Sequence, residues 1–470
     1  MKQLTQKLKN GSMTILDVSL PQLSTDKILV RVKYSLISSG SEGSTVKAAR
    51  KGLIGKAKER PQQMKQVFDT LKSQGPVQTY RAVMKKLDAY SPLGYSAVGE
   101  VVDLGDRMSN VGGQQLISTF KRGDLVACAG LTASHAEIVS VPENLCVKLQ
   151  NDTDLKQAAY NTLGAIALQG VRQADLRLGE NCLVVGLGLL GQLSCLLLRA
   201  AGIRVLGVDI DSQMVDIANR KCADEALVRG TPGIESKIHD FTGGIGCDAV
   251  IITAASSALD PINFAGTVAR KRGTIVVVGA VPTGFDREPH FYRKELQVRM
   301  SCSYGPGRYD PLYEEKGIDY PPAYVRWTEK RNMEAFQELI YSKKIDVSYL
   351  TTHTFKLENA PKAYDMLMAR SEPFIGILIE YDTSKEIVRE RISLQRSEVR
   401  GQRSDRGSQQ VGIGFIGAGS YAQSHLLPNV PKADVSLKGV LTSSGTSSRS
   451  VGEKFGFEFC AGSEAEIFEN

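Results

Sequence analysis

A glycine-rich turn between an apolar run and an apolar helical pattern is the clearest chemical signal in the sequence. The turn follows the apolar segment 181–185 and consists of Gly186, Leu187, Gly188, Leu189, Leu190 and Gly191. In such a turn the first glycine permits the tight bend, and the second lets a pyrophosphate approach the backbone. The third lets helix and strand pack closely, and the helix N-terminus faces the phosphates. The sequence therefore predicts a dinucleotide-binding site at 186–191.

An acidic residue lies where the ribose of such a dinucleotide would be recognised. The next apolar strand ends in Asp209, 18 residues beyond Gly191. A carboxylate at this place accepts hydrogen bonds from the adenosine ribose hydroxyls and repels a 2′-phosphate. We therefore predict that the site binds NAD(H) rather than NADP(H). The alternative to dinucleotide binding is a glycine-rich turn that binds no ligand.

The elements that would position this site fall into two patterns. Short β-branched runs separated by Gly, Asp and Pro occupy 12–45 and 92–148, which predicts an antiparallel, barrel-like β domain within 1–152. Between them, 46–90 has apolar residues at helical spacing among many Lys and Arg, so we expect two inserted helices. Strands and helices alternate over 153–305, which indicates a doubly wound parallel sheet.

The rest of the chain returns to the β domain and then leaves it. Residues 306–381 hold a helix and a strand that we expect to rejoin the first domain. Residues 382–410 are rich in Arg, Ser, Glu and Gln, which is typical of a linker. A nucleic-acid-binding arm is the alternative, disfavoured because acids interrupt the basic run and no aromatics interleave.

A second strand–glycine-loop–helix pattern begins at 411, with Gly417 and Gly419 in its loop. The following strand ends without an acid, so the argument made for Asp209 does not transfer, and NAD or NADP stays undetermined at this loop. Residues 411–470 are too few for a nucleotide-binding domain of ~100 or more residues. We expect an incomplete second Rossmann unit.

These motifs together resemble two known families. Residues 12–381 resemble the medium-chain dehydrogenase/reductase superfamily, in the glycine loop at 186–191, in the segment GYSAVGEVVDLG at 94–105 and in Glu295-Leu296. Residues 411–470 resemble the start of a Gfo/Idh/MocA-type oxidoreductase. The order of the two resembles bi-domain oxidoreductases of bacterial polysaccharide and sugar-modification pathways.

The resemblance implies a fold and a limit. The fold is α/β: a chaperonin-like (GroES-like) β domain and a doubly wound Rossmann sheet, followed by a linker and the incomplete second unit. The catalytic Glu-Lys-Pro motif of the second family is absent from the chain, so the second module as given would not be catalytic.

The resemblance also locates the positions where zinc-dependent relatives bind their metal. They fall on Ser39, Tyr95, Ser96 and Asn161. A tetrahedral zinc site needs thiolate, imidazole or carboxylate ligands, and these four side chains supply none. A four-cysteine structural lobe is missing as well, since only Cys128 and Cys146 lie in that region. We therefore predict no zinc and keep Asn161 as a substrate contact.

Without a metal, the resemblance leaves three hydroxyl groups at the reacting end. Tyr95 would donate a proton to the developing alkoxide, while Ser39 and Ser41 would hold the oxygen. Ser41 stands where relatives place a proton-relay hydroxyl. The alternative is that all three line the pocket without a chemical role.

Three further residues are substrate candidates. His135 lies where relatives approach the substrate, although a structural histidine is the better single interpretation. Tyr304 and Arg308 follow the last Rossmann strand in a Gly/Pro-rich turn, where Arg308 would bind a carboxylate or phosphate. A capping loop with a surface arginine is the alternative for this turn.

Charge and composition bound the partners. The net charge is +7, yet residues 46–88 alone carry +8. This basic segment favours a phosphorylated substrate such as a nucleotide-sugar, or a lipid-phosphate surface, with a solvated basic face as the alternative. No nucleic-acid recognition module is visible. The eight cysteines form no CxxC pair, and neither a secretion signal nor a membrane span is visible, so we expect a cytoplasmic protein.

The sequence thus predicts an NAD(H)-dependent, zinc-independent oxidoreductase acting on an alcohol or carbonyl group of a sugar or sugar-nucleotide. A non-catalytic nucleotide-binding scaffold and a zinc-free quinone or enone reductase remain alternatives. The resemblance implies association through the edge of the Rossmann sheet, so a homodimer is one candidate oligomeric state.

Overall fold

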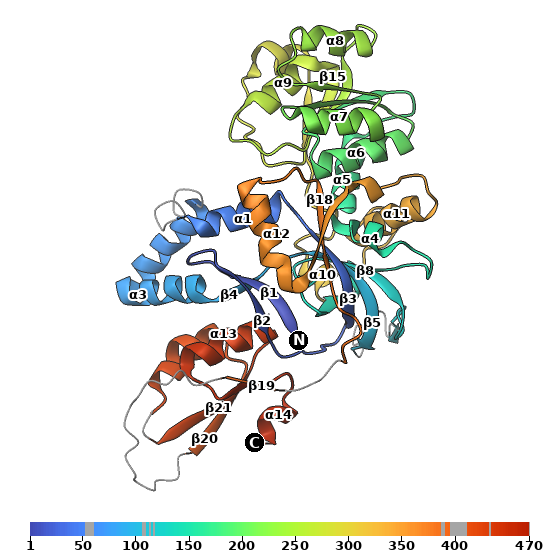
Figure 1. Cartoon of the computed structure of the whole chain (residues 1–470). Coiled ribbons are helices and arrows are strands. Elements are labelled where there is room, and N and C mark those ends of the chain that lie inside the picture. The colour runs from blue at the N-terminus through green and yellow to red at the C-terminus, as the bar shows by residue number, and fades with distance from the viewer. Residues whose placement is uncertain are drawn as a thin grey trace.

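The computed structural model describes residues 1–51, 61–105, 110–111, 114–115, 118–386, 391–394, 411–431 and 434–469. Figure 1 shows an α/β unit at the top, a β-rich unit in the middle and a smaller α/β unit, coloured red, at the bottom. None of the described helices is both long and apolar enough to cross a membrane.

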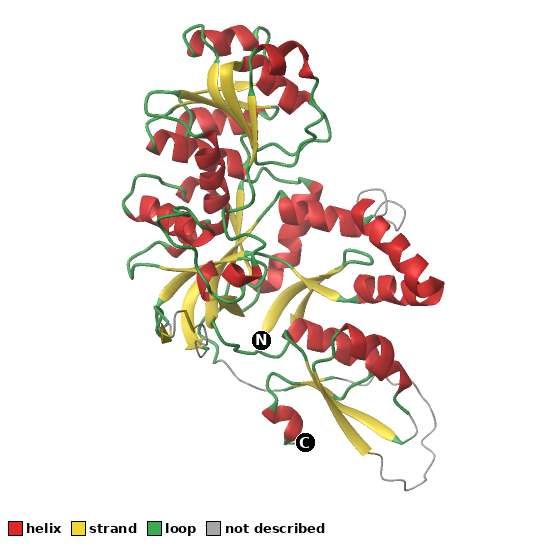
Figure 2. Ribbon diagram, turned by 180° about the vertical axis from the view of Figure 1, so that it is seen from behind, coloured by secondary structure: helices red, strands yellow, loops and turns green. Residues whose placement is uncertain are grey.

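The upper unit is a six-stranded parallel sheet in the order β13-β12-β11-β14-β15-β16. Its strands are β11 (Asn181–Val185), β12 (Arg204–Asp209), β13 (Glu225–Val228), β14 (Cys247–Ile252), β15 (Ala269–Val277) and β16 (Gln297–Met300). Its helices are α6 (Leu189–Ala200), α7 (Ser212–Lys221), α8 (Ile234–Phe241) and α9 (Asp260–Val268). The central strands are buried because both faces are covered by helices, as Figure 2 shows from behind. The predicted doubly wound sheet is confirmed.

The middle unit is built on a mixed sheet in the order β10-β8-β5-β3-β18-β17, with β9 also paired to β3. Its strands are β3 (Lys27–Ile37), β5 (Ser96–Leu104), β8 (Leu125–Ala129), β9 (Ile138–Pro142), β10 (Cys146–Lys148), β17 (Thr351–Lys356) and β18 (Gly376–Glu380). Strand β18 pairs antiparallel with β3, so the chain after the six-stranded parallel sheet does rejoin the β-rich middle unit.

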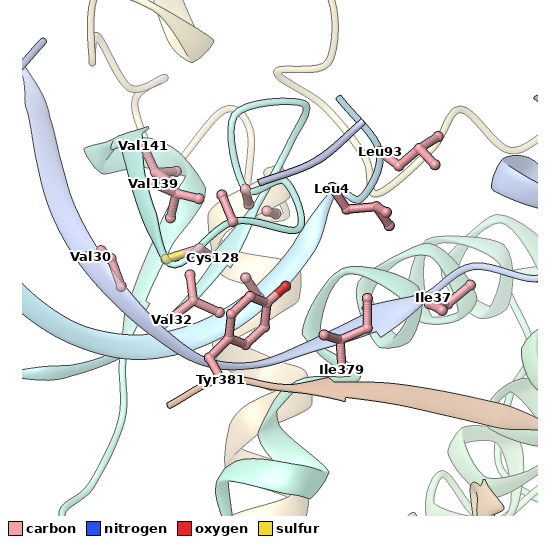
Figure 3. Close-up of a cluster of buried hydrophobic side chains, with 14 of the residues drawn as sticks. Leu4, Val30, Val32, Ile37, Leu93, Cys128, Val139, Val141, Ile379 and Tyr381 are labelled. Atoms are coloured by element: carbon pink, nitrogen blue, oxygen red, sulfur yellow. The ribbon is translucent and has the colours of Figure 1, made fainter. Parts of the chain in front are cut away.

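The core of the middle unit combines side chains from the early strands with side chains from the segment that returns near residue 380. Figure 3 shows Val30 and Val32 of β3 in the same cluster as Ile379 and Tyr381 from the returning segment. Burial of these apolar groups, at about 25 cal/mol per Å², holds the returning strand against the first unit.

Helices connect the two units and cover the middle sheet. They are α4 (Leu155–Ala158), α5 (Asn161–Ala174), α10 (Pro311–Glu314), α11 (Glu329–Tyr341) and α12 (Ala360–Ala369). Short helical turns occur at Glu143–Leu145, Arg287–Phe291, Ser348–Leu350 and Leu357–Asn359. A two-stranded ribbon joins β6 (Asn110–Val111) and β7 (Gln114–Gln115).

The inserted segment is helical. A helix that the sequence did not predict, α1 (Ser41–Arg50), comes first and begins at a candidate site residue. The two expected helices form the two arms of one bent helix, α3 (Pro61–Asp88), which bends at Gly75, whose φ is +78°. Glycine adopts this left-handed conformation without a Cβ clash, and the following Pro76 suits the first turn of the second arm. Residues 52–60 lie outside the described residues.

The insertion is carried by a small sheet of β1 (Lys2–Lys7), β2 (Met13–Asp17) and β4 (Tyr90–Pro92), in the order β2-β1-β4. The lower unit packs on this sheet: Thr446 donates a hydrogen bond to Gln3, and the Tyr90 hydroxyl donates to Glu453 at 3.0 Å.

The lower unit has four strands in the order β19-β22-β21-β20, and β20, β21 and β22 run parallel. Its elements are β19 (Ile392–Ser393), β20 (Val411–Ile416), β21 (Val435–Leu441), β22 (Phe459–Cys460), α13 (Gly445–Phe455), α14 (Ala465–Phe468) and helical turns at Ala422–Leu426 and Leu427–Asn429. Most of the predicted linker lies outside the described residues, since only 382–386 and 391–394 of it are described.

Candidate functional site

The glycine turn at 186–191 has the geometry that the sequence predicts. Gly186 has a φ of +96°, and its N–H donates to Val208 O at 2.8 Å, which joins the turn to β12. A Cβ on Gly191 would lie 1.9 Å from Gly186 O, so only glycine allows α6 to start this close to β11. A Cβ on Gly188 would meet nothing within 4 Å, so the backbone there faces open space. A dinucleotide pyrophosphate therefore fits this cradle.

Asp209 is aimed at this turn. Its carboxylate accepts hydrogen bonds from Leu187 N at 2.5 Å and from Asp211 N at 2.9 Å. Leu189 and Leu190, by contrast, point their side chains into the helix packing beneath the turn. The carboxylate is thus held at the mouth of the loop, where adenosine ribose hydroxyls would be bound.

Two residues of this cradle were not found from the sequence. Ile210 directly follows Asp209 and is 85% exposed, which offers an apolar surface beside the carboxylate. The Thr253 hydroxyl donates to Gly186 O at 2.6 Å from the end of β14. The only available signal for Thr253 was its place after the carboxyl end of a parallel strand, where ligands of such sheets bind.

Tyr95, the predicted proton donor, is bonded to a serine that was not among the predicted hydroxyls. Its hydroxyl donates to Ser38 Oγ at 2.7 Å. Burial raises the pKa of Tyr95, hydrogen bonding with the Ser38 and Ser41 hydroxyls opposes this, and the Glu42 carboxylate adds to the increase. Tyr95 therefore stays protonated across the neutral range. Ser39 is the half-buried neighbour of this pair.

Glu42 organises the cluster from beneath, and sequence reasoning missed it. Its Oε1 accepts a hydrogen bond from Ser38 N at 2.8 Å, and its Oε2 accepts one from the Tyr364 hydroxyl and lies 3.1 Å from His135 Nε2. The only sequence signal for Glu42 was its position directly after Ser39, Gly40 and Ser41.

His135 is a fully buried partner in this network. Its Nδ1 lies 2.7 Å from Ser35 Oγ, which in turn lies 2.7 Å from the Tyr381 hydroxyl. Gly94, with a φ of +94°, lets the chain before Tyr95 lie directly against His135, because a Cβ there would be 2.7 Å from His135 N. Both ring nitrogens have partners within the protein, which agrees with the structural interpretation of this histidine rather than with a substrate contact.

The positions of the family's zinc ligands do not fit the metal. Ser96 Oγ donates to Ala159 O at 2.8 Å, and the Asn161 amide donates to Met333 Sδ and accepts from Gln337 Nε2, both at 2.9 Å. Asn161 is therefore committed to α11, not to a pocket. None of these donors carries the negative charge or imidazole that zinc requires. Within the described ranges, His, Cys, Asp and Glu form no cluster of three or more that would hold a metal ion.

Tyr304 and Arg308 lie in one buried polar group. The Tyr304 hydroxyl is buried and has no hydrogen-bond partner in the described part of the chain. Its pKa is raised, by burial first and then by the charge of Glu329. Arg308 donates a hydrogen bond to Glu314, which neutralises its charge, so the predicted free anion-binding arginine is instead an ion pair.

Glu329 completes this group at the start of α11. Burial raises its pKa to about 9, and the neighbouring Glu314 carboxylate contributes, while Arg308 opposes the increase. Glu329 therefore carries a proton at neutral pH.

The second glycine loop is also formed. Gly417 has a φ of +83° and donates its N–H to Leu441 O at 2.9 Å, and a Cβ on Gly417 or Gly419 would meet nothing within 4 Å. Lys85 of α3 reaches this loop, with its Nζ 3.1 Å from Ser420 Oγ.

Comparison with known proteins finds dehydrogenases and reductases among the proteins that this chain resembles. Residues 190–315 match the family model described as zinc-binding dehydrogenase. The chain is 28% identical over 280 residues to D-guloside 3-dehydrogenase of Escherichia coli, covering 58% of this chain and 72% of that protein. It is 30% identical over 191 residues to a probable D-xylulose reductase A of Arthroderma otae, covering 39% and 52%.

Solved structures show the same fold. Galactitol-1-phosphate dehydrogenase from Escherichia coli superposes with a TM-score of 0.57 at 16% identity, over 81% of this chain and all of that one. The alcohol dehydrogenase of Thermus sp. ATN1 gives 0.58 at 18% identity, with the same coverage. The predicted resemblance to the medium-chain superfamily is thus confirmed for the fold. Residues 411–470 lie outside the matched family model, so the Gfo/Idh/MocA resemblance stays a prediction.

Proposed function

Because the chain is an oxidoreductase with a zinc-type alcohol dehydrogenase-like module, we propose that it transfers a hydride between NAD(H) and an alcohol or carbonyl of a sugar or sugar-nucleotide. We propose that it does so without zinc. The observation that carries the proposal is the Tyr95 hydroxyl held on Ser38 by a buried network. The family resemblance assigns one of the zinc-ligand positions to Tyr95.

The cofactor part of the proposal rests on Asp209 and the glycine turn. Gly186, Gly188 and Gly191 leave the backbone open to a pyrophosphate, and the Asp209 carboxylate favours an unphosphorylated ribose. When bound, the nicotinamide supplies or accepts the hydride.

The proton part rests on Tyr95. Its raised pKa keeps the phenol protonated, so in the reductive direction it donates its proton to the oxygen that gains negative charge. The Ser41 hydroxyl interacts with the phenol, and Ser39 follows the Ser38 that binds it; both serines would hold that oxygen by hydrogen bonds. A proton from water then restores the phenol.

Glu42 is proposed as a positioning residue. It fixes the Ser38 backbone and is itself fixed by His135 and Tyr364, so that the Tyr95 hydroxyl has one direction. His135 and Asn161 would support the walls of the site through their internal hydrogen bonds. A substrate hydroxyl is the partner we propose for the buried Tyr304 hydroxyl.

The substrate class is supported by the relatives, whose names describe action on a D-guloside and on D-xylulose. A phosphorylated or nucleotide-linked sugar would suit the basic segment 46–88. Two further parts of the proposal rest on the family resemblance alone. They are a role in polysaccharide biosynthesis and the binding of a dinucleotide at Gly417 and Gly419.

The test uses Tyr95→Phe, with Tyr324→Phe, at a tyrosine that is 88% exposed, as the matched control. NADH oxidation is measured on ketoses and oxidised sugar-nucleotides, and bound zinc is measured by elemental analysis of the same samples. We expect Tyr95→Phe to reduce turnover by about 10²-fold or more with unchanged NADH affinity, and substoichiometric zinc. Unchanged turnover would remove Tyr95 from the mechanism, and stoichiometric zinc required for activity would remove the metal-free proposal.

One alternative is a non-catalytic nucleotide-binding partner, favoured by the replacement of every metal ligand. It predicts NADH binding without turnover on any of these sugars, so the same assay separates the two functions.

A further inference from the structure

Helix α3 carries an apolar face that the described part of the protein covers only in part, since Met64 and Val67 are half-buried while Phe68 and Leu71 are exposed. Met64, Val67, Phe68 and Leu71 repeat at the spacing that places them on one side of the arm before Gly75. Phe68 is 55% exposed and Leu71 39%. None of the buried hydrophobic clusters formed by the described residues includes a residue of α3.

The arm after Gly75 adds an aromatic group. Tyr80 is 67% exposed, whereas the end of this arm is fixed to the body, where Lys9 N donates to Leu87 O at 2.9 Å. Figures 1 and 2 both show α3 at the outer margin of the molecule, joined to it through β4. The exposed apolar side chains of α3 thus lie on a projecting helix whose C-terminal end is hydrogen-bonded to the rest of the protein.

Lysines border this face. Lys65 and Lys72 are both exposed and lie about 100° around the helix from Met64 and Leu71, at the edge of the apolar stripe. The sequence segment 46–88 carries a net +8, while the rest of the chain is close to neutral. An apolar stripe with aromatic residues and flanking lysines is the pattern of helices that lie in the plane of an anionic bilayer surface.

We propose that α3 docks the protein on an anionic phospholipid bilayer, with Phe68, Leu71 and Tyr80 in the interface and Lys65 and Lys72 at the headgroups. The charge decides between occupants. Helix α3 itself carries five Lys/Arg and two Asp, a net +3, so a second copy would bring like charge against the first, whereas anionic headgroups neutralise it. The contact is peripheral, since no described helix is suited to cross a membrane.

The first experiment is sedimentation of the protein with vesicles of phosphatidylcholine, alone or with about 30% phosphatidylglycerol. Two double variants remove one component each: Phe68→Ser with Leu71→Ser, and Lys65→Glu with Lys72→Glu. The matched control is Ile245→Ser with Lys237→Glu, an exposed apolar residue and an exposed lysine of the upper unit.

We expect the wild type and the control to bind the anionic vesicles at least about tenfold more tightly than neutral ones, and both α3 variants to lose this binding. Absence of vesicle binding by the folded wild type overturns the proposal, as does equal binding by the α3 variants. Self-association that these variants abolish, without vesicle binding, also overturns it and assigns the face to a second copy.

A second measurement keeps the apolar face intact. Phe68→Trp adds an indole to a chain with a single tryptophan, Trp327, which is packed between Arg172 and Arg326. Its emission should shift to the blue, and be quenched by brominated lipids, on anionic vesicles only. If anionic vesicles change neither the emission wavelength nor the quenching of Phe68→Trp, the proposal is contradicted even if the protein sediments with them.

Discussion

Glu42 Oε2 lies 3.1 Å from His135 Nε2, and both side chains are buried beneath the Tyr95–Ser38 pair. The carboxylate comes from the start of α1, and the imidazole from the loop before β9. Because Tyr364 and Tyr381 join the same network from the returning segment, the first and last parts of the middle unit meet at one anionic centre. The orientation of Tyr95 therefore depends on the complete middle unit.

This network predicts an effect of Glu42 on the pH dependence of reduction. The Glu42 charge raises the pKa of Tyr95, and the phenol donates its proton only below that pKa. In Glu42→Gln the pKa falls, so the alkaline loss of kcat should begin at lower pH than in the wild type. A pH–rate profile checks this, with Glu358→Gln as the exposed control. An unshifted alkaline limb would show that Glu42 acts on the fold alone.

The same network was only partly accessible from the sequence. Ser39, Ser41 and Tyr95 were predicted because they replace residues of a known pattern. The bond from Tyr95 to Ser38 was not, since it depends on the turn before α1, which begins at Ser41. Glu42 has partners about 90 and 320 residues away along the chain, and no local pattern reports pairings of that range.

The nucleotide-binding unit was more predictable, because its signals are local. The strand, the glycine turn and the helix from 181 to 200 are contiguous, and Gly191 is required by the approach of Gly186 O within the same turn. Asn161 illustrates the opposite case. Its amide is committed to Met333 and Gln337, and this depends on how α11 packs on α5.

Asp209 predicts the cofactor preference. Wild type should bind NADH at least about tenfold more tightly than NADPH, since a carboxylate repels the 2′-phosphate. Asp209→Ala should weaken NADH binding and reduce the difference between the NADH and NADPH dissociation constants, as measured by quenching of protein fluorescence or by calorimetry. Asp216→Ala, an exposed acid on α7, is the control. Equal binding of NADPH by the wild type would contradict the assignment of NAD(H).

Glu329 predicts a stability that decreases with pH. Its pKa of about 9 lies above the ordinary 4.5, so the folded state holds a proton that the unfolded state has released. Stability should therefore fall between about pH 4.5 and pH 9. Glu329→Gln removes this titration and should raise the free energy of unfolding by about 1–3 kcal/mol at pH 8, with no gain at pH 4. Urea unfolding at both values checks this, with Glu338→Gln on the exposed side of α11 as control; a gain that is the same at both pH values would assign the effect to packing.

Substitutions at Gly191 and Gly188, two of the three glycines of the turn, should separate an effect on folding from an effect on binding. In Gly191→Ala the new Cβ would lie 1.9 Å from Gly186 O, so α6 must move and the unit should unfold at lower denaturant concentration. In Gly188→Ala the Cβ enters open space, so stability should be close to that of the wild type, while the methyl group occupies the volume that a pyrophosphate needs. NADH affinity should fall by about tenfold or more in Gly188→Ala, measured on protein whose unfolding midpoint is unchanged. If Gly188→Ala bound NADH like the wild type, the open space at Gly188 would not be the phosphate cradle, and the dinucleotide site would have to lie elsewhere on this sheet.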